Sequence, residues 1–404
     1  MVKSSNRVLA MQSSPIRRLI PYADEAKAKG KKVYHLNIGQ PDIKTPPAYF
    51  EAIRKFSLDV VAYATSQGNN DLRDAMCAYY KEWNINLKRD DILVTNGGSE
   101  ALMFAFMVMC DPGDEVLVPE PFYANYNAFS QCVNVTIKPI TTKAEDGFHL
   151  PSKEAMEKLI TPKTRAFLVS NPGNPTGTIY TEKEMQDLAD LAKKHDMFIV
   201  ADEVYREFVY DGLKYKSFGH MEDIADRVII IDSVSKRYSA CGARVGCFAC
   251  RNKDIIANVL KLCQGRLCIS TLEQVGAAAL YSTPKSYLEE VNKEYVSRRD
   301  TLYKALKQMP GVVCEEPKGA FYVVVKLPVD DAEKFVIWML QHFDVNGETM
   351  MAAPAEGFYA TKGLGKNEFR LAYVLKNEDL VKAMNILKLG LEAYPGRVEA
   401  IATR

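Results

Sequence analysis

The chain has 404 residues, of which 47% are hydrophobic, and it carries 52 Lys and Arg against 51 Asp and Glu. This length suits about two to three domains, each with its own core. The balanced charge gives no overall field that would attract nucleic acid or an anionic membrane. The longest apolar run, residues 101–110, is far shorter than the ~20 residues that cross a bilayer, and the N-terminus lacks the apolar core of a secretory signal. We therefore expect a cytoplasmic globular protein with no nucleic-acid or membrane partner.

The N-terminal segment, residues 1–45, is basic and amphipathic and then rich in turn formers through NIGQPDIKTPP. We expect it to form an arm that packs onto a second domain or onto a partner subunit and contributes to that smaller domain.

From about residue 90 to residue 250, short β-rich apolar runs alternate with helical patterns. The predicted strands lie within residues 92–98, 115–123, 135–140, 165–173, 197–205 and 227–236, and the clearest predicted helices span Ser99–Met109 and Glu182–His195. Strands that are buried on both faces and joined by helices predict an α/β fold, with a large, doubly wound and mostly parallel sheet over residues 46–285. Ligands of such sheets bind beyond the C-terminal ends of the strands, so the residues just after each run are the candidates for a site.

After residue 285 the pattern changes to a long charged helix, followed by GVVCEEPKGAFYVVVKL and further helical segments. This pattern predicts a smaller α+β domain over residues 286–404.

The nine cysteines are scattered without a repeating spacing, which is typical of free thiols in a reducing compartment. Cys247 and Cys250 form a CxxC, but the run CFAC reads as a strand, in which positions three apart point to opposite faces. We therefore expect no metal or redox site there.

Lys236 is the most informative residue, because it follows the apolar run RVIII at a predicted sheet edge. A partly desolvated lysine can become a nucleophilic amine that forms a Schiff base with an aldehyde. The hydroxyl of Ser233 and the guanidinium of Arg244 lie close by in sequence and are good phosphate ligands. These residues together predict an aldehyde cofactor that carries a phosphate.

Other predicted strand ends carry residues that suit the same chemistry, although each also has a structural interpretation. In NGGSEAL, Gly98 and Ser99 stand at a helix N-terminus, which attracts an anion, but Ser99 also suits an N-cap. Tyr123 in PEPFYANY could lie against a planar cofactor or pack in the core. Asn174, in the turn-rich SNPGNPTG, could offer its amide to a phenolic or carboxylate oxygen.

Charged residues complete this set. Asp202 in ADEVY, three residues before Tyr205, could keep a ring nitrogen protonated, or it could be a helix cap or an ion-pair partner. Arg370 in NEFRLAYV sits in an apolar stretch, where its charge needs a carboxylate from a substrate or from a structural salt bridge.

The motifs YATSQGNNDLR, NGGSEAL, PFYANY, SNPGNPTG, ADEVY, SVSKRYSACGARVG and EFRLAYV, taken in this order, resemble those of pyridoxal-phosphate aminotransferases. The resemblance is to class I/II enzymes of the aspartate aminotransferase family, fold type I, and it runs from about residue 35 to the C-terminus.

The resemblance implies that Lys236 forms a Schiff base with pyridoxal 5'-phosphate and then moves the proton between the substrate and the cofactor. It implies that Asp202 pairs with the pyridinium nitrogen and that Tyr123 stacks on the ring. It further implies that Tyr205 and Asn174 bond the ring oxygen, and that the phosphate is held by Gly98, Ser99, Ser233, Arg244 and, from the neighbouring subunit of a homodimer, Tyr63. Arg370 would bind the α-carboxylate of the substrate, helped by Asn174 and by the backbone of Gly39.

The resemblance leaves the substrate open. Related bacterial enzymes often carry a lysine at the position of Ser99 that contacts a distal carboxylate, and we expect Arg266 to serve instead, unless it is structural. Amino acids and 2-oxo acids such as aspartate and 2-oxoglutarate are the expected substrates. Aromatic or alanine-type substrates are the alternative if Tyr22, Tyr63, Tyr123 and Phe358 form an apolar wall. A C–S lyase or another eliminating enzyme of the same fold is a further alternative, whereas a DNA-binding regulator lacks the basic domain it would need.

Overall fold

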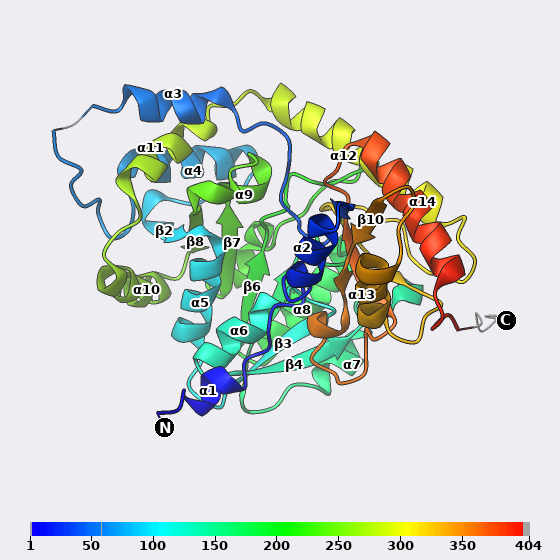
Figure 1. The fold of residues 1–404 in the computed structure, drawn as a ribbon. Helices are drawn as coiled ribbons and strands as arrows, with labels where there is room; N and C mark the ends of the chain where they lie inside the picture. The colour runs from blue at the N-terminus through cyan, green and yellow to red at the C-terminus, as the bar shows by residue number, and fades with distance from the viewer. Residues whose placement is uncertain (1, 58, 399–404) are drawn as a thin grey trace.

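The computed structural model describes residues 2–57 and 59–398, and it has a larger and a smaller part joined by the long helix α12 (Figure 1). Helix α12 (Lys285–Leu306) begins where Tyr287 touches the core of the larger part, and it ends with Leu302 and Leu306 in the core of the smaller part. The charged run that predicted a long helix therefore connects the two cores.

The larger part contains a seven-stranded sheet in the order β2-β8-β7-β6-β5-β3-β4. Its strands are β2 (Ile92–Asn96), β3 (Glu115–Glu120), β4 (Thr136–Thr141), β5 (Thr164–Ser170), β6 (Phe198–Asp202), β7 (Val228–Ser233) and β8 (Val245–Cys250). Strands β7, β6, β5, β3 and β4 pair in parallel, and β8 runs antiparallel to both of its neighbours. The predicted α/β fold with a mostly parallel sheet is confirmed.

Helices cover both faces of this sheet, because alternate strand residues point into two separate cores. Side chains from α4, α8 and α11 line one core, and side chains from α5, α6 and α10 line the other. The helices of this part are α3 (Pro47–Lys55), α4 (Asn70–Glu82), α5 (Gly97–Met109), α6 (Asn125–Cys132), α7 (Lys153–Glu157), α8 (Glu182–Lys194), α9 (Val234–Arg237), α10 (Lys253–Arg266) and α11 (Thr271–Leu280). Short 3₁₀ helices span Arg89–Asp91, Ala144–Asp146, Phe218–His220, Glu222–Ile224, Cys241–Ala243 and Glu356–Phe358.

A capping box fixes the start of the predicted helix α8. This helix begins at Glu182 because the side chains of Thr181 and Glu184 cap each other's backbone N–H groups.

The two cysteines of the CxxC lie on opposite faces of strand β8. Cys247 faces one core and Cys250 faces the other, as the strand period predicts. Within residues 2–57 and 59–398 no cluster of metal-ligating side chains occurs.

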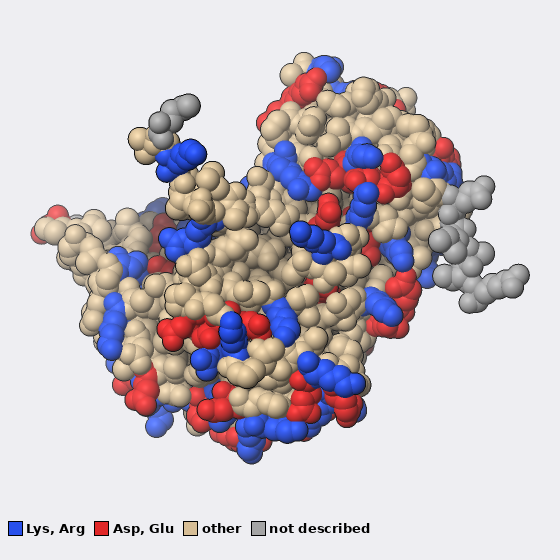
Figure 2. Space-filling model, turned by 90° about the horizontal axis from the view of Figure 1, so that it is seen from below, with Lys and Arg blue, Asp and Glu red and all other residues tan. Residues whose placement is uncertain are grey.

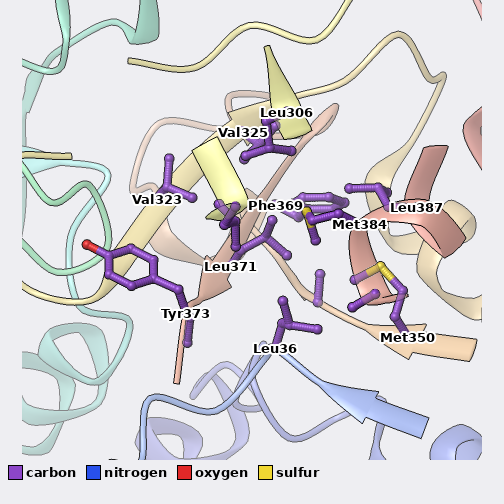
Figure 3. Packing of buried hydrophobic residues seen from close by; sticks show 14 of the residues in the cluster. Leu36, Leu306, Val323, Val325, Met350, Phe369, Leu371, Tyr373, Met384 and Leu387 are labelled. Atoms are coloured by element: carbon purple, nitrogen blue, oxygen red, sulfur yellow. The ribbon is translucent and has the colours of Figure 1, made fainter. Parts of the chain in front are cut away.

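The smaller part combines both ends of the chain. Its strands are β1 (Lys32–His35), β9 (Tyr322–Lys326), β10 (Glu348–Met351), β11 (Ala353–Pro354) and β12 (Glu368–Ala372), and its other helices are α2 (Ile20–Ala28), α13 (Ala332–His342) and α14 (Asn377–Ala393), with α1 (Asn6–Leu9) near the N-terminus. Strand β1 pairs in parallel with β10, and β12 pairs antiparallel with both β11 and β9. Leu36 from the N-terminal segment packs with Phe369 and Leu387 in this core (Figure 3).

The surface mixes charges of both signs. On the face seen in Figure 2, Lys and Arg side chains are interspersed with Asp and Glu side chains. Among the helices in the described part of the chain, none is both long and apolar enough to span a membrane.

One close backbone approach joins β8 to the start of α5. A Cβ atom at Gly246 would lie 2.6 Å from Gly97 C, 2.7 Å from Asp232 O and 2.8 Å from Gly98 N. These contacts involve backbone atoms of a strand and a helix, which have little room to shift. Only a glycine at position 246 therefore lets the helix N-terminus rest on the sheet.

We expect Gly246→Ala to lower the free energy of unfolding by about 1–3 kcal/mol through overpacking. Urea unfolding followed by circular dichroism measures this change. The matched control is Gly242→Ala, because a Cβ there meets nothing within 4 Å. Equal stabilities of the two variants would contradict this account of the packing.

Candidate active site

A cavity of about 680 Å³ opens where the larger part meets the smaller part. Sequence-predicted residues that line it are Gly39, Gly98, Ser99, Tyr123, Asn174, Asp202, Tyr205, Ser233, Lys236, Arg244 and Arg370. They come from the ends of β6 and β7, from the start of α5, from β12 and from the loops that carry Gly39, Tyr123, Asn174 and Arg244, which are far apart in sequence. A second hollow of about 690 Å³ contains none of these residues.

Lys236 lies in the short helix α9, directly after β7. The hydroxyl of Ser233 accepts a hydrogen bond from Ser235 N at 3.1 Å and so caps this helix. The Nζ atom of Lys236 donates to Gly39 O at 2.9 Å and lies 3.8 Å from the Sγ atom of Cys241. The amine is therefore fixed inside the cavity by neutral groups and makes no ion pair with a described carboxylate.

Asp202 ends β6 on the floor of the cavity and has one carboxylate oxygen free. Its Oδ2 accepts a hydrogen bond from the Tyr126 hydroxyl at 2.7 Å, whereas its Oδ1 has no hydrogen-bond partner within the described residues. Burial raises the pKa of Asp202 to about 6, against the lowering effect of the Tyr126 hydrogen bond. A positively charged N–H group from a ligand would both satisfy Oδ1 and stabilise the charge.

The N-terminus of α5 forms an anion-binding pole with Arg244. Gly98 and Ser99 lie in the first turn of this 13-residue helix, where backbone N–H groups are free and the helix dipole is positive. The Nη2 atom of Arg244 donates to Asn96 O at 3.3 Å, and it would lie 2.7 Å from a Cβ at Gly97. Glycine at position 97 therefore lets the guanidinium lie over the helix end.

Arg370 is a buried cation on β12. Its Nη1 donates to Asn174 Oδ1 at 3.1 Å and its Nη2 donates to Asn37 O at 2.6 Å, while its Nε has no partner among the described residues. Burial lowers the pKa of Arg370, and no ion pair with a described carboxylate compensates the charge. Such a site is costly unless an anion arrives, so a ligand carboxylate suits it.

Two polar side chains, Asn174 and Tyr205, lie next to Arg370 in the cavity. Asn174 faces Arg370 through its Oδ1 atom and the Tyr205 hydroxyl, at 3.5 Å, through its Nδ2 atom. The Tyr205 hydroxyl lies 2.8 Å from the Tyr322 hydroxyl, and the Arg370 guanidinium stands 4.5 Å above the Tyr322 ring. The amide of Asn174 therefore joins the Tyr205 hydroxyl to the Arg370 guanidinium, and its contact with a ring oxygen and a carboxylate stays a prediction.

Several predicted residues do not line the cavity of this chain. The side chain of Tyr63 is 82% exposed. Arg266 lies beside Glu100, with 3.3 Å between Nε and Oε1, and donates to Val94 O at 3.0 Å. Tyr22 packs against the core of the smaller part, and Phe358 stacks behind Arg370 at 5.2 Å. Of the four aromatic residues that were expected to form an apolar wall, only Tyr123 therefore lines the cavity within one chain.

The fold also brings to the site residues that were not predicted. Tyr126 and Tyr322 bond predicted site residues, Asn37 holds Arg370, and Arg17 lines the cavity. Tyr126 belongs to the same PFYANY motif as Tyr123, and that proximity in sequence was an available signal. The other three residues gave no signal in a single sequence.

Comparison with known proteins supports the chemistry of this cavity. The model of the family described as aminotransferase class I and II matches residues 31–387. The chain is 31% identical to an aspartate aminotransferase of Bacillus subtilis, over 97% of this chain and 100% of that protein, and 30% identical to an asparagine–oxo-acid transaminase of Streptococcus mutans, over 97% and 100%. A solved structure of an alanine aminotransferase from Pyrococcus furiosus superposes with a TM-score of 0.89 at 30% identity, covering 97% of this chain and 100% of that one. The chain that builds this cavity therefore belongs to the class I and II aminotransferases and is a transaminase.

Proposed function

We propose that this aminotransferase uses pyridoxal 5'-phosphate and moves the amino group between an L-amino acid and a 2-oxo acid, with aspartate and 2-oxoglutarate as the preferred pair. The observation that carries the proposal is that the cavity unites Lys236, Asp202 and Arg370. Among the described residues, Asp202 Oδ1 has no hydrogen-bond partner and Arg370 has no ion-pair partner. Aspartate is the substrate named for the Bacillus subtilis relative, and alanine-type substrates are the alternative.

The donors and acceptors of the cavity fit this cofactor. The α5 N-terminus, Ser99 and Arg244 would hold its phosphate, and Ser233 lies beside them. Tyr205 and Asn174 would bond the ring oxygen, and Tyr123 would lie against the ring. Asp202 Oδ1 would accept the N–H of the ring, which an orphaned buried carboxylate oxygen favours.

The reaction needs a proton to leave the substrate α-carbon, and the bound cofactor supplies an electron-withdrawing ring that makes this possible. Lys236 Nζ would hold the cofactor covalently and, when free, its amine could take and return that proton. Asp202 would keep the ring nitrogen protonated. Arg370 and Asn174 orient the substrate through its α-carboxylate, helped by the Gly39 backbone.

We also propose that two copies of the chain form the active unit, with Tyr63 reaching the phosphate of the partner. An exposed apolar stretch supports this, since Val60, Val61 and Tyr63 are 71%, 65% and 82% exposed. A cytoplasmic location is supported by nine free cysteines, which suit a reducing compartment.

Lys236→Ala is expected to abolish covalent cofactor attachment and to lower turnover by roughly 10²–10⁴-fold, as loss of a proton-transfer group does. Borohydride reduction followed by peptide mass spectrometry should find the reduced cofactor on Lys236 in the wild type and none in the variant. The control is Lys261→Ala, an exposed lysine that pairs with Asn258. Release of ammonia and pyruvate instead of amino transfer would indicate a lyase and overturn the proposal.

Asp202→Asn should stabilise the cofactor-free protein at pH 8 while reducing turnover of the cofactor-loaded enzyme. The pKa of Asp202 is about 6 in the native state against 3.8 as the ordinary value. Between these values the native state retains a proton that the unfolded state loses, so stability falls as pH rises. Above pH 6, the buried Asp202 charge lowers the free energy of unfolding by on the order of 2–3 kcal/mol. The asparagine carries no charge and therefore removes this loss of stability.

Thermal unfolding at fixed protein concentration measures this effect. The melting temperature of Asp202→Asn should exceed that of the wild type at pH 8 and match it near pH 4. The control is Asp146→Asn, an exposed aspartate. A gain that is the same at both pH values would show that burial of the Asp202 charge is not its cause.

Tyr63→Phe should weaken cofactor binding about 10-fold or more through loss of a hydrogen bond to a charged group. Absorbance titration of the cofactor-free protein measures the dissociation constant, with Tyr303→Phe, a half-buried tyrosine, as the control. A mixed dimer of Tyr63→Phe and Lys236→Ala chains would contain one site with both native groups and should regain tight binding there. If Tyr63 acted within its own chain, the mixed dimer would regain none.

A further inference from the structure

The cavity holds one basic side chain that the proposed function does not use. The basic residues that line it are Arg17, Lys236, Arg244 and Arg370. Lys236 is assigned to covalent attachment, Arg244 to the cofactor phosphate and Arg370 to the α-carboxylate. Arg17 remains without a role, although a second guanidinium in such a cavity is a strong anion-binding group.

Arg17 belongs to a segment that forms part of the cavity wall. Ser14, Ile16 and Arg17 all line the cavity, upstream of α2. The Arg17 side chain is exposed, and it makes no hydrogen bond or ion pair with any described residue. The adjacent Arg18 differs, because it pairs with Glu333. Arg18 therefore makes a structural ion pair, whereas the guanidinium of Arg17 is accessible to a ligand in the cavity.

A single buried residue ties the Arg17 segment to the α-carboxylate site. Asn37 is completely buried, and its Nδ2 donates to Ile16 O at 3.0 Å. The carbonyl oxygen of Asn37 accepts the Nη2–H of Arg370 at 2.6 Å. The backbone next to Arg17 and the guanidinium of Arg370 are thus held to the same residue, which fixes the segment that carries Arg17 beside the α-carboxylate site.

Both arginines also act electrostatically on the same ring. Burial raises the pKa of Tyr123 to about 12, and the positive charges of Arg370 and Arg17 both oppose that rise. Tyr123 lines the same cavity as both arginines. Arg17 and Arg370 therefore border one cavity, and both lie near enough to Tyr123 to act on its hydroxyl.

We propose that Arg17 binds the distal carboxylate of a dicarboxylic substrate and selects this class over neutral amino acids. This inference rests on the proposed function and names its selectivity residue. Within one chain, Arg17 takes the role of distal-carboxylate ligand that was expected of Arg266, because the Glu100 carboxylate already lies beside the Arg266 guanidinium. Arg17 has no such competitor among the described residues, and a planar guanidinium can hold a carboxylate in two parallel hydrogen bonds.

Equilibrium binding of unreactive acids to the cofactor-loaded enzyme tests the assignment directly. Calorimetry should show that Arg17→Gln raises the dissociation constant of succinate by about 10–100-fold, the loss expected for hydrogen bonds between charged groups. The dissociation constant of propionate, which lacks the second carboxylate, should change less than 3-fold. Arg17→Lys, which keeps the charge, should recover part of the succinate affinity.

Two matched variants make the result decisive. Arg18→Gln changes the neighbouring arginine that faces Glu333, and Arg266→Gln changes the other candidate; neither should alter the ratio of succinate to propionate affinity. Kinetics should agree, with the selectivity ratio of kcat/KM for aspartate over alanine falling at least 10-fold in Arg17→Gln.

An unchanged succinate to propionate ratio in Arg17→Gln, or a loss carried by Arg266→Gln, would overturn the assignment. Failure of the proposed function has a different signature, since the wild type would then transfer no amino group from any donor, whatever its preference among acids.

Discussion

A buried ionic network next to the cavity holds the cavity residues Asp202, Ser233 and Lys236 in place. Arg206 donates to Glu203 at 2.7 Å and lies 3.3 Å from Asp232, and Arg237 donates to Asp232 at 2.6 Å. None of these four side chains is more than 3% exposed. Removing one partner of such a network leaves an uncompensated buried charge, which typically costs 3–5 kcal/mol. The ends of β6, β7 and α9 are therefore fixed relative to one another.

The network controls the site because its members are chain neighbours of cavity residues. The adjacent pairs are Asp202 with Glu203, Asp232 with Ser233, and Lys236 with Arg237. In each pair one side chain faces the cavity and its neighbour joins the network. The rigidity of the ionic network therefore fixes the neighbouring cavity residues, and a reaction that is sensitive to small displacements requires such fixed groups.

Sequence reasoning was effective where a site residue is adjacent to a strong local pattern. Lys236 and Asp202 follow apolar strands, and the rule that parallel strands present ligands at their C-terminal ends was enough to bring them together. It failed for Asn37, Tyr322 and Arg17, since the smaller part of the molecule brings Tyr322 and Arg17 to the cavity and places Asn37 behind Arg370. The position of Tyr322 depends on the pairing of β9 with β12, and that of Arg17 and Asn37 on the packing of the N-terminal segment; no local period encodes these contacts.

Net charge was a poor guide to the ligands of this chain, although the balanced composition agrees with the mixture of both charge signs on the face in Figure 2. The whole chain carries a formal charge of +1, yet four basic side chains and one aspartate line the cavity. A cavity with low-dielectric walls focuses the field of the charges within it, so affinity for anions depends on the local sum. A phosphate on α5 and Arg244 and a carboxylate on Arg370 would still leave the guanidinium of Arg17 without a partner among the described residues, and the proposed second carboxylate of the substrate would pair with it.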